Sequence, residues 1–64
     1  MTGKCLRHLR TRAGLRCEDI AAAVDRNYGH LARVEREDKE IVLPLSSWFN
    51  LSQLLNIPID KLPR

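Results

Sequence analysis

Two cysteines and two histidines are the side chains of this 64-residue chain best suited to metal or nucleophile chemistry. Structural zinc sites typically combine cysteines about two to four residues apart with histidines about three to five residues apart. Cys5 and His8 are separated by two residues. Cys17 and His30 are separated by twelve. Because this spacing does not match a zinc site, we expect no metal and no cofactor.

Catalysis also has little support in the sequence. We find no Ser/His/Asp or Cys/His arrangement with supporting motif context, no carboxylate pair expected to face a cleft, and no glycine-rich phosphate loop. Cys17 is expected at the start of a helix beside Arg16, a setting that lowers the pKa of a thiol. A redox role for Cys17 therefore stays open, but the sequence predicts a protein that is not an enzyme.

Length and composition define the class of protein. Sixty-four residues form one small domain with a thin core, and 44% hydrophobic and 30% charged residues are typical of a soluble globule. The longest apolar runs, residues 20–24 and 41–45, are too short to cross a bilayer. Basic residues interrupt the N-terminal segment where a signal peptide is apolar. We therefore expect a single domain over residues 1–64, with no membrane partner, in the reducing cytoplasm.

The charge of the chain is modestly positive and unevenly distributed. Eleven basic and eight acidic residues give a net charge of +3. Residues 1–16 contain five basic residues and no acid, and most of the acids lie at residues 18–19 and 35–40. A basic end attracts polyanions at long range. A solvated helix face explains the same charges, and charge alone does not separate the two interpretations.

Apolar residues recur at helical spacing along the whole chain, which predicts an all-α fold. The expected elements are a helix ending at Gly14, helices at Cys17 to Val24 and Tyr28 to Arg36, a loop from Glu37 to Pro44, a fourth helix ending near Asn56, and a last turn at Ile59 to Leu62. The apolar stripe expected in the fourth helix consists of Leu45, Trp48, Phe49, Ser52 and Leu55, with Leu51 and Leu54 beside it. The prediction is a compact domain of five short helices.

The second and third helices are joined by only three residues, so they must cross steeply, as in a helix-turn-helix unit at about residues 17–36. Leu31 and Val34 anchor the third helix, which leaves its opposite face exposed. A helix presented in this way fits the major groove of DNA. The residues expected to read bases are Asn27, Tyr28, Gly29, Ala32 and Arg33. The alternative is a bundle helix whose polar face only meets solvent.

The chemistry of these residues suits base recognition. Arg33 can donate two hydrogen bonds to guanine, Ala32 can contact a thymine methyl, and Asn27 or Tyr28 can donate to bases or phosphates. Gly29 gives clearance, at a cost of about 1 kcal/mol of helix stability relative to alanine. The residues expected to contact phosphate are Arg10, Arg16, Arg26, His30, Arg36 and Lys39.

An ordered set of short motifs extends over roughly residues 4–62. It comprises Leu6-Arg7-x-Leu9-Arg10, Gly14-Leu15, Glu18-Asp19-Ile20-Ala21, Leu31-x-Arg33-Val34-Glu35-Arg36, and Leu51-x-x-Leu54-Leu55-Asn56-Ile57-Pro58-Ile59-Asp60-Lys61-Leu62. This set resembles the XRE family of helix-turn-helix domains, the Cro and phage-repressor type. The resemblance implies a lambda-repressor-like fold of five helices that binds operator DNA as a dimer. It also implies a partly buried ion pair between Arg10 and Glu35, which orients Arg10 toward phosphate.

The chain departs from the family pattern at several positions. Arg16 and Cys17 stand where the family commonly has serine and glutamine. Asp25 replaces the usual turn glycine, and Arg26 replaces an apolar turn residue and adds a phosphate ligand. The loop after the third helix is acidic, which leaves only Lys39 there to approach phosphate.

The sequence thus predicts a sequence-specific transcriptional regulator, a standalone Cro-like repressor acting on a near-palindromic operator in the bacterial nucleoid or a phage-infected cell. No small-molecule ligand is expected. The dimer patch is expected at Leu54, Pro58, Ile59 and Leu62, although these residues can equally close the monomer core. The alternatives are a protein-interaction module of the same fold, such as an antitoxin or anti-repressor, and a basic domain that coats nucleic acid without sequence preference.

Overall fold

The computed structural model describes residues 1–63, and in this range it contains four α-helices and one short 3-10 helix. The elements are α1 (Gly3–Arg12), α2 (Cys17–Val24), α3 (Tyr28–Glu37), α4 (Leu45–Leu55) and η1 (Ile59–Lys61). The predicted all-α class is confirmed, but the last turn is a 3-10 helix rather than a fifth α-helix. Leu62 already has extended backbone, which ends η1 after a single turn. No helix within residues 1–63 has the length and apolar character that crossing a membrane requires.

The helices end where the sequence places residues that tolerate left-handed backbone. Gly14 has a φ of 72° just after α1. Asp25 and Asn56 have φ values of 54° and 58° at the ends of α2 and α4, as expected for these side chains. Asn27 begins α3, because its side-chain oxygen accepts a hydrogen bond from the Gly29 N–H at 2.8 Å. These ends therefore follow from local sequence.

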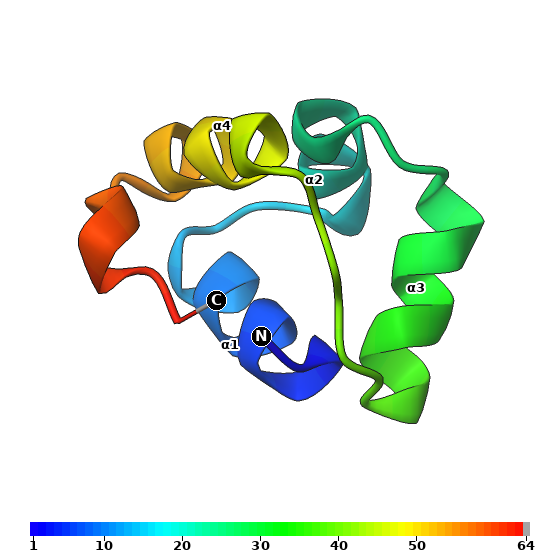
Figure 1. Ribbon diagram of the computed structural model, residues 1–64. Helices are drawn as coiled ribbons and strands as arrows, with labels where there is room; N and C mark the ends of the chain where they lie inside the picture. Colours follow the sequence, from blue (N-terminus) through cyan, green and yellow to red (C-terminus); the bar gives the residue numbers. More distant parts are fainter. Residues whose placement is uncertain (64) are drawn as a thin grey trace.

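The four α-helices are arranged around a common centre (Figure 1), and the buried apolar side chains form one core cluster. Contacts between elements join α1 to α3, α2 to both α3 and α4, and α4 to η1. The side chains with the least exposure are Leu6, Ile20, Val24, Leu31 and Leu51. Each of the four α-helices contributes at least one of these residues, so the core depends on the whole chain rather than on one helix pair.

The beginning of the chain pairs with the segment that follows α3. Thr2 forms an isolated antiparallel bridge with Glu40, and the Ile41 N–H donates to the Met1 carbonyl at 2.9 Å. The Gly3 N–H donates to the Lys39 carbonyl at 2.8 Å. Gly3 lies so close to α3 that a Cβ atom there would be 2.0 Å from the Val34 carbonyl oxygen. Glycine is needed at this position because α1 and α3 approach closely.

The segment between α3 and α4, which was predicted as a loop, contributes side chains to the core. Ile41 and Leu43 are buried, whereas Val42 between them is exposed. The segment runs along the molecule from the end of α3 to the start of α4 (Figure 1). Alternate side chains of this extended stretch therefore complete the core.

The buried face of α4 agrees with the predicted stripe at Trp48, Ser52 and Leu55 but not at its other two positions. Ser47, Trp48, Leu51, Ser52 and Leu55 are buried, whereas Leu45 and Phe49 are exposed. The prediction that Phe49 lies in the core is therefore wrong. Both serines can be buried because their hydroxyls donate to backbone carbonyls, Ser47 to Val24 at 3.4 Å and Ser52 to Phe49 at 2.7 Å. Ser47 and Ser52 therefore face the core, whereas Leu45 and Phe49 face solvent.

Candidate nucleic-acid interface

The outer face of α3 is the strongest candidate for a binding surface. Leu31 and Val34 are buried and attach α3 to the core. On the other side, Tyr28 is 58% exposed and the Arg33 side chain is 62% exposed. Asn27 and Gly29 are also exposed, and Ala32 is partly buried. The predicted orientation of α3 is confirmed, whereas the reading of bases by these residues stays a prediction.

The short connection before α3 fixes its direction relative to α2. The Arg26 N–H donates to the Ala21 carbonyl at 3.0 Å while Asp25 takes up left-handed backbone. Asn27 then caps α3, and its own carbonyl accepts from the Leu31 N–H at 3.2 Å. Three residues are thus enough to stop one helix and start the next, and all of the turn side chains are exposed.

Two shallow hollows flank the first turn of α3. One lies toward the start of α2 and is lined by Arg10, Arg16, Cys17, Glu18 and Tyr28. The other lies toward the segment after α3 and is lined by Arg26, Asn27, His30, Glu40 and Val42. Four of the predicted phosphate ligands therefore line these hollows, Arg10 and Arg16 in one and Arg26 and His30 in the other. Arg36 and Lys39 line neither hollow.

The predicted ion pair between Arg10 and Glu35 is present. Arg10 donates from Nε and Nη2 to the two carboxylate oxygens of Glu35 at 3.0 and 2.8 Å. Its Nη1 donates to the Leu15 carbonyl at 3.1 Å. The hydrogen bond with Glu35 raises the pKa of Arg10, partly opposed by burial. Since three of its five N–H groups are engaged, Arg10 has only two left with which to meet a phosphate.

Most of the other predicted phosphate ligands also have acidic partners. Arg16 lies 2.9 Å from Glu18, Arg36 lies 4.0 Å from Glu37, and Lys39 lies 3.6 Å from Glu37. All of these pairs are on the surface. Surface pairs add little stability, so they yield readily to a stronger anion.

Glu37 is a residue of this surface that the sequence analysis missed. Its Oε2 accepts a hydrogen bond from Arg33 Nε at 2.7 Å. This hydrogen bond is the largest cause of the lowered pKa of Glu37, and burial opposes it weakly. The spacing of four residues between Arg33 and Glu37 was the available signal, because side chains so placed are neighbours on a helix.

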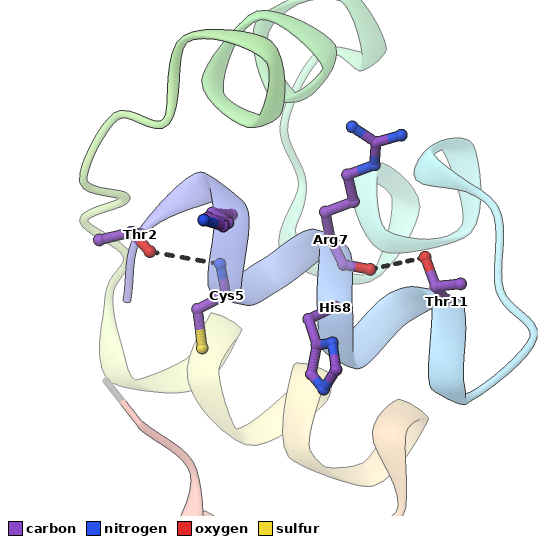
Figure 2. Close-up of a pocket in the computed structure, with 6 residues that line it drawn as sticks. Thr2, Cys5, Arg7, His8 and Thr11 are labelled. Carbon is purple, nitrogen blue, oxygen red and sulfur yellow. Dashed lines mark hydrogen bonds between the residues drawn. The ribbon is translucent and has the colours of Figure 1, made fainter.

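Free positive charge lies mainly on α1. Among residues 1–63, Lys4, Arg7, Arg12, Arg26 and Lys61 form no ion pair. Lys4 and Arg7 line a shallow hollow on the outer face of α1, together with Thr2, Cys5, His8 and Thr11. In Figure 2 the Arg7 side chain points away from one side of α1, and the side chains of Cys5 and His8 point away from the other side. The sequence indicated the basic end but did not single out Lys4 and Arg7.

The cysteines and histidines are distributed over three helices. Cys5 and His8 are on α1, Cys17 is on α2 and His30 is on α3. Both thiols are free. Burial raises the pKa of the Cys17 thiol, Glu35 raises it further, and Arg10 partly opposes them. The expectation of a lowered pKa at Cys17 is therefore wrong, because burial and the Glu35 carboxylate outweigh the opposing effect of Arg10.

The residues of the predicted dimer patch divide between surface and core. Leu54 and Pro58 are exposed, and Ile59 is partly buried against the core. Leu62 is buried in the monomer, so its assignment to the patch is wrong. Leu62 belongs instead to the core cluster of the monomer, against which Ile57 and Ile59 also pack.

The region around the start of α3 thus combines an anchored helix, exposed donors and flanking cations. These features belong to three elements that are held in place by the core and by the Arg10–Glu35 pair. Comparisons of the chain with protein-family models, curated proteins and solved structures found no match.

Proposed function

We propose that this protein is a sequence-specific DNA-binding transcriptional regulator of the helix-turn-helix type, with a lambda-repressor-like arrangement of its helices. The observation that carries the proposal is the orientation of α3. Leu31 and Val34 hold the helix from behind, while Tyr28 and Arg33 extend into solvent. A helix anchored on one face can enter the major groove with its other face, where every base pair shows a distinct pattern of donors and acceptors.

The residues at the start of α3 have distinct roles in this proposal. Arg33 donates to guanine through its terminal amino groups, and Ala32 and Gly29 allow close approach. Asn27 uses its side-chain oxygen as the helix cap, so its amino group is the part available to a base or phosphate. Tyr28 lies beside the start of α2 and reaches the same region of the groove.

The flanking cations contact the DNA backbone on both sides of α3. Arg16 and part of Arg10 meet phosphate from the hollow beside α2. Arg26 and His30 do so from the hollow on the other side, and Arg36 and Lys39 extend this contact toward the end of α3. Phosphate contacts of this kind fix the register of the protein on DNA, and base contacts then supply specificity.

We further propose that the protein acts as a Cro-like repressor in the cytoplasm of a bacterial or phage-infected cell and binds a near-palindromic operator as a homodimer. Leu54, Pro58 and Ile59 are the surface contribution to the dimer patch. A dimer places its two recognition helices about 34 Å apart, one turn of DNA. A domain of 64 residues buries little apolar surface in its core, and dimerisation would bury more.

Selection from a random duplex pool with the purified protein tests the proposal. We expect enrichment of two related half-sites in inverted orientation. Arg33→Ala should lose about 1–3 kcal/mol of binding and relax the preference at one base pair in each half-site. Arg12→Ala removes the same charge from the end of α1, where Arg12 lies beside Leu55 and Ile57, and should leave every base preference intact.

Two other results would exclude sequence-specific regulation. Binding that is independent of sequence and falls steeply with salt indicates a nucleic-acid coating protein. The complete absence of DNA binding in both the wild type and Arg33→Ala indicates a protein-interaction module instead.

A specific observation favours the protein-interaction module as the second candidate function. Val42, Leu45 and Phe49 are 79%, 65% and 50% exposed, so a small domain shows several large apolar side chains to solvent. Exposed apolar side chains mark contacts with other proteins where they form a contiguous patch. If this is the function, Phe49→Ser should abolish capture of a protein partner, while Arg33→Ala should leave that capture unchanged.

A further inference from the structure

We propose that Glu37 is a specificity-determining residue of the DNA-reading surface: it orients Arg33 toward a base and withholds neighbouring cations from the phosphates of non-target DNA. This inference rests on the proposed DNA-binding function. In this role the carboxylate of Glu37 contributes to the recognition of target DNA, although a negative charge by itself repels phosphate.

The geometry of the Arg33–Glu37 pair supports the orienting role. The two residues lie one helical turn apart, and Arg33 Nε donates to Glu37 Oε2 at 2.7 Å. A guanidinium carries five N–H donors in a rigid plane. The contact with Glu37 engages the Nε edge and fixes that plane. The two terminal amino groups remain free, and these donate to the O6 and N7 atoms of guanine in a bidentate contact.

The position of the carboxylate supports the second role. Glu37 Oε1 lies 3.6 Å from Lys39 Nζ, and Oε2 lies 4.0 Å from Arg36 Nη2. One carboxylate is therefore near three cations, all of which are well exposed. Free surface cations bind any duplex through release of counterions. By compensating part of this positive charge, Glu37 weakens binding to non-target DNA more than binding to a target, where base contacts add to the phosphate contacts.

The ionisation of Glu37 agrees with both roles. Its pKa is lowered, chiefly by the hydrogen bond with Arg33, so the contact with Arg33 favours the charged carboxylate. Because its partners lie on the surface, a phosphate of target DNA can replace Glu37 at Arg36 and Lys39 without disturbing the core. Arg33 alone has the short contact that sets the direction of its guanidinium.

Glu18 provides a matched control. It pairs with Arg16 at 2.9 Å, is exposed, and lies on α2 rather than α3. Glu37→Ala and Glu18→Ala therefore remove the same charge from the same protein surface, but only the first releases Arg33. Both positions are exposed, and alanine favours helix. Circular dichroism checks that each variant is folded, and Glu37→Gln, which keeps the length of the side chain, provides a second variant.

The affinity of each protein is measured on three duplexes over a range of salt concentrations. These are the selected site, the same site with the guanine assigned to Arg33 replaced, and a duplex lacking the site. For Glu37→Ala we expect non-target affinity to rise about threefold to tenfold, with a salt dependence steeper by about one ion. Discrimination against the replaced guanine should fall about tenfold. Glu18→Ala should raise non-target affinity but keep the discrimination.

The outcomes separate this inference from the proposed function. Equal discrimination in Glu37→Ala, Glu18→Ala and the wild type, on a site that the wild type selects, overturns the role of Glu37 alone. Equal loss of discrimination in both variants also overturns it, because charge rather than the orientation of Arg33 then explains the effect. A wild-type protein that selects no site overturns the proposed function itself.

Discussion

Arg10 and Glu35 join α1 to α3 through two parallel hydrogen bonds of 3.0 and 2.8 Å. Their side chains are only 19% and 8% exposed. Arg10 also donates to the Leu15 carbonyl at 3.1 Å, which ties the connection between α1 and α2 to the same point. The pair thus holds the outward-facing helix in a fixed position relative to two other parts of the chain.

Breaking this pair should destabilise the domain. Arg10→Met leaves the poorly hydrated Glu35 carboxylate without its partner, so we expect the free energy of unfolding to fall by about 2–4 kcal/mol. The double variant Arg10→Met with Glu35→Leu should recover much of the loss, because no unpaired charge remains. Urea denaturation of the wild type, both single variants and the double variant measures this. Additive losses would contradict the expectation.

The close approach of α1 and α3 gives a second prediction. In Gly3→Ala the new Cβ would lie 2.0 Å from the Val34 carbonyl oxygen, so one of the two helices must move. We expect a loss of stability of about 1–3 kcal/mol, or more if the helices cannot separate. Amide NMR signals from residues 34–39 should shift as well.

Gly14→Ala is the matched control for this steric effect. Nothing lies within 4 Å of a Cβ atom at Gly14, but its φ of 72° is unfavourable for alanine. The cost should be about 1–2 kcal/mol, without any change in the signals of residues 34–39. Shifts of these signals in both variants would show that they do not report on the contact with Gly3.

Asn27 has two roles that one substitution can separate. Its side-chain oxygen caps α3, and we propose that its amino group meets DNA. Asn27→Asp keeps the cap oxygen and adds a negative charge at a helix start, so stability should be unchanged or slightly raised. DNA affinity should fall, because the carboxylate repels phosphate and lacks the amino donor. Asn27→Ala should lower both stability, by about 1 kcal/mol, and affinity. Thermal unfolding and DNA binding assays on the same samples distinguish these outcomes.

The region from α2 to α3 could be predicted closely from the sequence. The bounds of α2 and the burial of Leu31 and Val34 are as expected. Asp25 takes up left-handed backbone and Asn27 caps α3, as local preferences of these residue types favour. These features depend on residues within a few positions of one another. Local preferences for caps, turns and apolar spacing therefore determine most of the geometry of the candidate site.

The features that could not be predicted depend on contacts distant in the sequence. The apolar pattern of α4 favoured Phe49, but Ser47 faces the core instead, because its hydroxyl donates to the Val24 carbonyl. The pairing of Thr2 with Glu40 and the packing of Gly3 on α3 join the two ends of a long stretch of chain. No local pattern of charge or hydropathy specifies which segments meet in this way.

The titration of Glu37 tests the ion pair in the absence of DNA. The hydrogen bond with Arg33 favours the carboxylate, so the pKa of Glu37 should lie below the ordinary range of glutamate. Arg33→Met removes the main cause and should bring the pKa back toward its ordinary value. Arg12→Met, which removes a distant charge from α1, should not. Side-chain carboxyl NMR signals followed from neutral to acid pH give the three midpoints, and an ordinary midpoint in the wild type would contradict the pair.

The reactivity of Cys17 can be tested in a variant that carries Cys5→Ser and so contains a single thiol. Burial and the Glu35 carboxylate raise the pKa of Cys17. Since the thiolate is the reactive form, alkylation by iodoacetamide should be slow at neutral pH and should increase with a midpoint above that of an ordinary cysteine. Glu35→Gln removes a charge that disfavours the thiolate and should lower the midpoint. Glu18→Gln, whose effect on Cys17 is weaker, should lower it less. A midpoint below the ordinary range would instead make Cys17 a candidate redox sensor beside the DNA-reading helix.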